Sequence, residues 1–196
     1  ALLCLDKGDL EGATQHIDAA SIRGEGAIVS YVRGNIAARQ GHLRSALTYF
    51  DEAIQIDPTH VRARLNRTSI HMANEDAQAA LDDAKVLLEL APGLALAKLR
   101  KAEANMMLSN WEEAKDDLEQ IVEDAPHHHH ALTQLASCFM AMDRPEKAEA
   151  PLNEALRLAP DHTEAWHQRG LLYLTGLKKN QLSTTSRQQY AVTATT

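Results

Sequence analysis

Aromatic side chains are scarce in this sequence, making up only 4% of its 196 residues, although apolar residues as a whole make up 44%. β-Sandwiches are enriched in aromatic and β-branched residues, so this composition favours closely packed helices. Positive charge is also in deficit, with a formal net charge of −7. Because nucleic-acid binding needs a positive surface, we predict no nucleic-acid partner.

Cysteine is nearly absent: Cys4 and Cys138 stand alone, without a CxxC motif. Two isolated cysteines do not make a disulfide framework. No apolar run approaches the roughly 20 residues that span a bilayer, so we predict no membrane insertion. The chain begins Ala-Leu-Leu-Cys without a methionine, which indicates a processed protein or an excised fragment, and we make no prediction of localisation.

The sequence also lacks the short motifs of common catalytic sites. It contains no phosphate-binding glycine loop, HExxH or GxSxG. The pairs Glu112-Glu113 and Asp116-Asp117 could act as catalytic carboxylates, but a solvated helix face is the interpretation we favour. We therefore predict that the chain is not an enzyme, and we assign no catalytic residue and no cofactor.

A repeat is the strongest signal in the sequence. Two series of residues recur at intervals of 34: Pro58, Pro92, Pro126 and Pro160, and Ala46, Ala80, Ala114 and Ala148. They define units at 27–60, 61–94, 95–128 and 129–162. We expect a partial repeat at 1–26, the first helix of a fifth unit at 163–176, and a capping helix or disordered tail at 177–196.

Each unit divides into two amphipathic helices, which we call helix A and helix B. In the first unit we predict helix A at 27–40 and helix B at 43–56, with Gly41 ending the first and Pro58 stopping the second. Later units have Glu75, Ser109 and Asp143 in the place of Gly41. Pro151 falls inside the fourth helix B, where an interior proline costs roughly 3 kcal/mol, so we predict a kink there.

This pattern resembles the tetratricopeptide repeat family. The matching residues are Gly34, Gly41, Ala46, Phe50, Ala53 and Pro58 in the first unit, and Trp166, Gly170 and Tyr173 in the last. Small residues such as Gly34 and Gly170 are expected where helices cross closely. The resemblance covers about residues 1–176. It implies an all-α fold, a right-handed α-solenoid of antiparallel helix hairpins with about four complete repeats and a concave surface lined by helix A.

The resemblance also implies a peptide-binding surface on helix A. The candidate residues are Tyr31, Asn35, Arg62, Asn66, Ser69, Arg100 and Gln134. Family members that clamp a C-terminal carboxylate use five such positions. Here Asn35, Asn66 and Arg100 match, whereas Tyr31 and Leu96 occupy the two lysine positions. Asparagine can pair with a peptide backbone and arginine can grip a carboxylate, so either a clamp or a more general peptide groove is compatible with these residues.

Charge is distributed unevenly between the two helices of the second and third units. The helix A segments carry Arg62, Arg64, Arg67, Lys98, Arg100 and Lys101, whereas the helix B segments are acidic. A positive concave layer would attract an acidic or C-terminal segment of a partner. Alternatively, several of these arginines pair internally with helix B carboxylates.

Four consecutive histidines, His127–His130, admit two interpretations. Imidazole is a common metal ligand, but consecutive histidines on a helix point in different directions. His60 and His162 occupy equivalent turns, which indicates that histidine suits this turn generally. We favour the turn interpretation and predict no metal site.

The function that we predict from these features is a protein–protein interaction scaffold that holds a peptide or segment of a partner. Two alternatives stay open. The array could be a structural spacer or self-association segment of a larger assembly or secretion-type protein, or it could be the non-catalytic repeat region of a larger enzyme.

Overall fold

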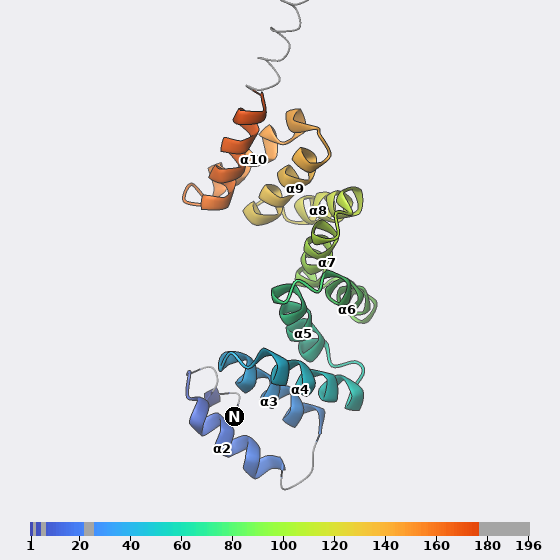
Figure 1. The fold of residues 1–196 in the computed structure, drawn as a ribbon, viewed down its shortest axis with the longest axis vertical. Helices are drawn as coiled ribbons and strands as arrows, with labels where there is room; N and C mark the ends of the chain where they lie inside the picture. The colour runs from blue at the N-terminus through green and yellow to red at the C-terminus, as the bar shows by residue number, and fades with distance from the viewer. Residues whose placement is uncertain (2, 5–6, 22–25, 177–196) are drawn as a thin grey trace, which may run out of the picture. The chain divides into compact units, whose positions relative to one another are not determined.

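The computed structural model describes residues 1, 3–4, 7–21 and 26–176, except for the side chain of residue 21. All regular structure in this part of the chain is helical, as predicted (Figure 1). The expected cap or tail at 177–196 lies outside the described residues. The helices are α2 (Leu10–Ser21), α3 (Ala27–Arg39), α4 (Leu43–Ile56), α5 (Val61–Ala73), α6 (Ala77–Leu90), α7 (Ala95–Met107), α8 (Trp111–Asp124), α9 (His129–Ala141), the 3₁₀ helix η1 (Pro145–Lys147) and α10 (Glu149–Leu158).

A further helix occupies residues 163–176, up to the end of the described part. None of the helices in the described ranges is both long enough and apolar enough to cross a membrane. The predicted helix pair of the first unit is found as α3 and α4, and both begin at the predicted residues. The 34-residue spacing therefore located helix boundaries as well as helix type.

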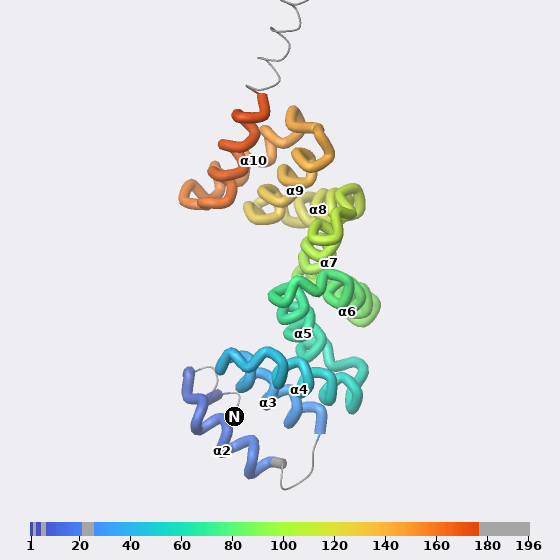
Figure 2. The backbone as a smooth tube through the Cα atoms, viewed as in Figure 1, coloured from blue at the N-terminus to red at the C-terminus, as the bar shows by residue number. Residues whose placement is uncertain are grey.

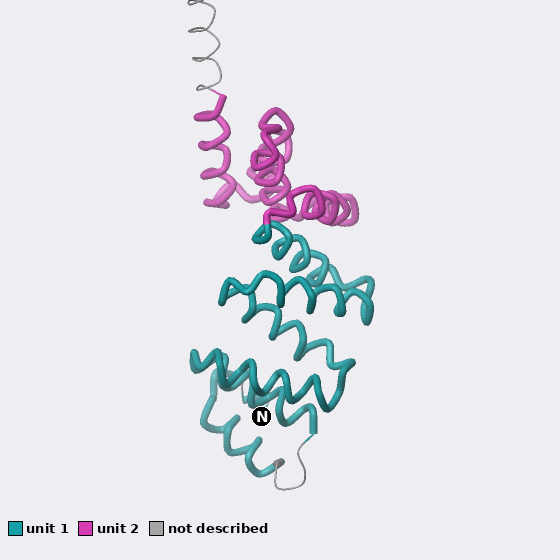
Figure 3. The backbone as a smooth tube through the Cα atoms, turned by 45° about the vertical axis from the view of Figure 1, so that its right-hand side comes forward, with its two compact units in different colours: residues 1–108 teal, residues 109–196 magenta. Residues whose placement is uncertain are grey.

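The chain forms two compact units, residues 1–108 and residues 109–196 (Figure 3). Unit 1 contains α2 to α7, and unit 2 begins with α8. Within unit 1, α3 packs on α4, α4 on α5, α5 on α6 and α6 on α7. Within unit 2, α8 packs on α9 and α9 on α10. Each helix thus contacts mainly its neighbours in sequence, as the tube in Figure 2 lets the reader follow within each unit.

The buried positions of helix B repeat with the sequence. Ala46, Ala80, Ala114 and Ala148 are fully buried, and so are the residues four places later, Phe50, Ala84, Leu118 and Leu152. Positions four and seven residues apart lie on one face of a helix, so this face meets the core in every hairpin. The predicted apolar stripe is confirmed.

Gly34 permits a close crossing of α3 and α4 in unit 1. A Cβ atom built on Gly34 would lie 2.5 Å from Cε1 of Phe50, a separation that side-chain atoms do not tolerate. At Gly170 a Cβ atom would meet nothing within 4 Å among the described residues. The helix B expected to cross there lies outside those residues, so the close crossing at Gly170 stays a prediction.

The turn from helix A to helix B keeps one backbone conformation whatever residue stands in it. Gly8 and Gly41 have φ values of 76° and 79°, and Glu75, Ser109 and Asp143 have φ values of 60°, 63° and 55°. A left-handed residue ends the preceding helix and is favourable mainly for glycine. The departures from glycine noted in the sequence therefore leave the turn geometry unchanged.

Pro151 disturbs its helix as predicted, and the disturbance lies upstream of the proline. The fourth helix B is split into η1 and α10, and Pro151 is the third residue of α10. Proline is tolerated in the first turn because the N–H groups there have no partner within the helix. Starting α10 at Glu149 places Pro151 in that turn and avoids the cost of an interior proline.

Candidate functional site

The candidate site residues of unit 1 lie on three successive helix A segments. We call them the helix-A row: Asn35 on α3, Arg62, Asn66 and Ser69 on α5, and Arg100 on α7. On α5, Arg62 precedes Asn66 by four residues and Ser69 follows it by three, so these side chains share one face of the helix. Arg62 and Ser69 are exposed, and Asn66 is half-buried.

The centre of the row is a pair of amides. Nδ2 of Asn66 donates a hydrogen bond to Oδ1 of Asn35, with a donor–acceptor distance of 2.6 Å. A side-chain amide has two donors and two acceptor lone pairs, so one mutual bond uses only part of the capacity of the pair. Both residues are half-buried.

Arg100 has its charge partly compensated within its own helix. Its Nη1 atom lies 2.6 Å from Oε2 of Glu103, and both side chains are largely shielded from solvent. A ligand carboxylate that binds Arg100 must therefore compete with, or share, the Glu103 carboxylate. The three-residue spacing of Arg100 and Glu103 is a sequence signal for this ion pair, because residues at i and i+3 are neighbours on a helix.

Tyr31 differs from the other candidates because it is 8% exposed. Its ring packs against Phe50 and His60, at centroid distances of 6.2 and 4.9 Å. Little of the ring is left to contact a ligand. Its packing instead fixes α3 against the turn that begins α5, which places Asn35 relative to Asn66.

A buried ion-pair network holds α5 in position. Arg67 donates to both carboxylate oxygens of Asp83, over 2.8 and 2.6 Å, and its Nη1 atom lies 2.6 Å from Oδ1 of Asp51. Nη1 of Arg64 also donates to Asp83, at 3.0 Å, and its Nη2 donates to the carbonyl of Pro58. The hydrogen bonds that Arg67 donates to Asp83 raise the pKa of its guanidinium group above the ordinary value. The network therefore ties α5 to α4 and α6.

This network decides between the two interpretations of the basic residues. Arg64 and Arg67 pair with helix B carboxylates, so they do not belong to a free positive layer. Arg62 is exposed on the face of the helix-A row and is not buried with them. The sequence could not separate Arg64 and Arg67 from Arg62, because their partner Asp83 lies on another helix.

Gln134, the remaining candidate, belongs to unit 2 and is 8% exposed. Its Nε2 atom lies 2.9 Å from Nε2 of His130, one helical turn earlier on α9. This contact places the Gln134 side chain beside the ring of His130.

Two histidines of the inter-repeat turns, His60 and His128, serve as helix caps. Nδ1 of His60 accepts from the N–H of Ala63, and Nδ1 of His128 accepts from the N–H of Ala131, each at 3.1 Å. An N-cap acceptor satisfies one of the N–H groups that a helix leaves without a partner. The turn interpretation is confirmed for these two positions.

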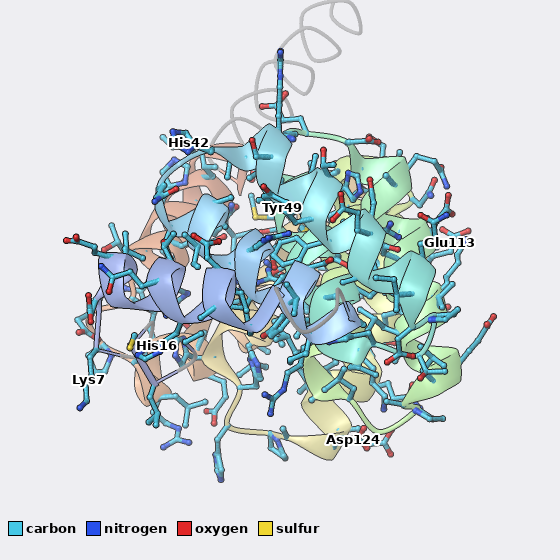
Figure 4. All side chains as sticks on the ribbon, turned by 90° about the horizontal axis from the view of Figure 1, so that it is seen from below. Lys7, His16, His42, Tyr49, Glu113 and Asp124 are labelled. Atoms are coloured by element: carbon cyan, nitrogen blue, oxygen red, sulfur yellow. The ribbon has the colours of Figure 1, made fainter. Side chains whose placement is uncertain are left out.

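A small pocket lies beside α2 in unit 1. Its volume is about 180 Å³, and its lining includes Asp18 and Arg33 together with Ile36 and Tyr49. Tyr49, which Figure 4 labels, reaches it from α4. The pocket is too small for a folded partner and is separate from the helix-A row.

The acidic pairs of α8 lie mostly on its solvent-exposed face, and Asp117 is half-buried. Glu112, Glu113 and Asp116 are exposed, and Glu113 is labelled near the start of α8 in Figure 4. Nζ of Lys115 lies 3.3 Å from Glu112 and 2.7 Å from Asp116. These contacts match a solvated, ion-paired face better than an arrangement of catalytic carboxylates.

Comparison with known proteins gives a consistent assignment. Two family models described as tetratricopeptide repeat match residues 31–95 and 106–170. A search of the curated proteins gives no significant match.

Solved structures resemble the chain over most of its length. YrrB, described as a TPR protein with an unusual peptide-binding site, is 21% identical with a TM-score of 0.78, over 86% of this chain and 87% of YrrB. MamA from Desulfovibrio magneticus RS-1 is 18% identical with a TM-score of 0.75, over 82% of this chain and 92% of that one. The first TPR of Spaghetti (RPAP3), bound to the HSP90 peptide SRMEEVD, is 26% identical with a TM-score of 0.56, over 60% of this chain and 93% of that one.

Proposed function

Because the chain belongs to the tetratricopeptide repeat family, whose members are generally non-catalytic interaction scaffolds, we propose that unit 1 binds an extended segment of a partner protein along the helix-A row. The observation that carries this proposal is the amide pair of Asn35 and Asn66, which lies between two successive helix A segments. Exposed Arg62 and Ser69 flank it on α5. Amides spaced along a repeat array can bond a peptide backbone without specifying its side chains.

The charges of the row favour an acidic segment. Arg62 is exposed and Arg100 is half-buried, and arginine binds carboxylates through two parallel hydrogen bonds. The relative RPAP3 was solved with the acidic peptide SRMEEVD, which supports testing this ligand class first. The row lacks both lysines of the carboxylate clamp, so recognition of acidic side chains is the form of binding that we propose.

The scaffold is held rigid by the Arg64–Arg67–Asp83 network and by the packing of Tyr31. A site presented on rigid helices loses little conformational entropy on binding. Rigidity therefore allows a modest set of polar contacts to give measurable affinity.

We expect the double substitution Asn66→Ala and Arg100→Ala to reduce the affinity for an acidic peptide at least 10-fold. Both the backbone contacts and one carboxylate contact would be lost, and each is worth about 1–3 kcal/mol. Fluorescence anisotropy with labelled SRMEEVD, and with peptides selected from a library against the intact chain, gives the measurement.

Lys85→Ala is the matched control, since Lys85 is an exposed basic residue on α6, outside the row. It should leave peptide affinity unchanged, and circular dichroism should show all variants folded. Unchanged affinity of the double variant for a peptide that binds the parent chain would reject the site. If no peptide binds while light scattering shows concentration-dependent oligomers, the spacer or self-association role is the better description.

A further inference from the structure

In unit 2, three potential metal ligands converge where α9 meets the helix at residues 163–176. They are His130 in the first turn of α9, His162 just before the following helix, and Glu164 in its first turn. One ligand atom from each lies within 4.8 Å of the other two. The three side chains come from segments that only the folded hairpin brings together.

The distances suit a metal better than a direct bond between the side chains. Nδ1 of His130 lies 3.7 Å from Oε2 of Glu164, beyond a good hydrogen bond. Zinc bonds of about 2.0–2.1 Å in tetrahedral geometry place two ligand atoms roughly 3.4 Å apart. The three ligand atoms lie within 4.8 Å of one another, so binding would require side-chain rotations that draw them closer to such a centre.

His162 differs from the other turn histidines. His60 and His128 use Nδ1 to cap the helix that follows. Nε2 of His162 is buried and makes no hydrogen bond within the described residues. The ring of His129 packs edge-on against that of His162, with a centroid distance of 4.8 Å. A buried ring nitrogen without a partner costs free energy, which a bond to a metal would offset.

Gln134 completes the surroundings of the cluster. Its amide lies 2.9 Å from Nε2 of His130, on the side of the ring opposite the nitrogen that faces Glu164. A metal-bound histidine normally donates its other N–H to an oxygen, which fixes the orientation of the ring. In the structure the amide Nε2 faces this ring nitrogen, so a 180° turn of the Gln134 amide would be needed to present Oε1 as the acceptor of a hydrogen bond from that N–H.

We propose that His130, His162 and Glu164 form a binding site for a divalent transition metal, with Zn²⁺ as the best-matched ion. Two imidazoles and a carboxylate are a known zinc ligand set that leaves the fourth position to solvent. His130 and Glu164 are partly exposed, so an ion can enter. The bound ion would connect α9 to the helix at residues 163–176. This proposal departs from the absence of metal predicted from the sequence, and it is independent of peptide binding by unit 1.

Isothermal titration of the full, untagged chain with zinc chloride tests the site. We expect one zinc ion per chain, with affinity reduced at least 10-fold by His162→Ala and by Glu164→Gln. His127→Ala is the matched control, because His127 is exposed and adjacent in sequence but outside the cluster. It should bind zinc like the parent chain.

Thermal unfolding with EDTA and with zinc provides a second readout. Zinc should raise the Tm of the parent chain and of His127→Ala, and it should leave the Tm of Glu164→Gln unchanged. Glu164 is exposed, so this variant stays informative even if His162→Ala fails to fold. Zinc binding that weakens equally in His127→Ala, or that survives both ligand substitutions, would show an adventitious ion only and overturn the proposal.

Discussion

Asp83 on α6 holds two arginines of α5. It is 5% exposed, yet it accepts hydrogen bonds from Arg64 and from Arg67. Buried charges are tolerated only when they are paired, and removal of one partner leaves the other charge uncompensated in a medium of low polarity. The helix-A row therefore depends on a carboxylate that lies outside it.

We expect Asp83→Ala to destabilise the chain by about 3–5 kcal/mol, because Arg64 would be left buried without its carboxylate. Urea unfolding followed by circular dichroism measures this change. The adjacent Asp82 is exposed and accepts an exposed hydrogen bond from Gln78, so Asp82→Ala should change stability by less than about 0.5 kcal/mol. Equal effects of the two substitutions would contradict a structural role for the network.

The turn between helix A and helix B has a similar positive φ value in every described hairpin, although the residue at that position differs. The left-handed residue after helix A is glycine at position 41 but glutamate at position 75, with φ values of 79° and 60°. Residues other than glycine adopt this conformation at a cost of about 1 kcal/mol or more. The α5–α6 turn therefore stores a small local strain that the α3–α4 turn lacks.

We expect Glu75→Gly to stabilise the chain by about 0.5–1 kcal/mol, because relief of the strain at positive φ exceeds the extra entropy of glycine in the unfolded chain. The reciprocal substitution, Gly41→Ala, should destabilise by about 1 kcal/mol. A Cβ atom at Gly41 meets nothing within 4 Å, so its cost reports the backbone conformation alone. Denaturant midpoints of the two variants give the comparison, and a loss of stability in Glu75→Gly would contradict it.

Pro151 shows how an element adapts to a residue that does not suit its interior. The fourth helix B begins as the 3₁₀ helix Pro145–Lys147, and its α-helical part starts two residues before the proline. Ala148 and Leu152 remain fully buried across this break. The core contacts of the repeat are therefore kept at the place where the regular α-helical hydrogen bonding of helix B is broken.

Across the whole molecule, stability is distributed among neighbouring helices in each unit. In such arrays each hairpin contacts mainly the next one, so parts of the chain can open separately.

The reactivity of Cys138 measures whether unit 2 is folded. Cys138 is fully buried on α9, and burial raises the pKa of its thiol to about 11.

In a Cys4→Ser background we expect iodoacetamide at pH 8 to label Cys138 at least 100-fold more slowly in the folded chain than in urea. The thiolate is the reactive form, and the folded chain both shields the thiol and disfavours its ionisation. The pKa of Cys138 in the folded chain, about 11, is above the ordinary value of 9.0. The contribution of the neutral Cys138 thiol to the free energy of unfolding is therefore present below pH 9 and is lost as the pH rises from 9 to 11. Mass spectrometry follows the labelling, and rapid modification of the folded chain would contradict this burial.

The sequence alone determined the repeat, the helix type and the buried face of helix B, because these depend on periodicity along one chain segment. The 34-residue spacing of Pro58, Pro92 and the later prolines, together with the alanine series, was sufficient for that. It was also sufficient to place Asn66 and Arg100 at one repeated position of successive helix A segments, and Asn35 and Ser69 at another.

Only the tertiary structure decided which polar residues meet. Asp83 joins Arg64 and Arg67 from another helix, and His162 and Glu164 join His130 from the following turn. Such contacts depend on the distance and rotation between helices, which residue spacing within a single helix does not specify. For that reason, the sequence left the basic residues and the histidines with two interpretations each.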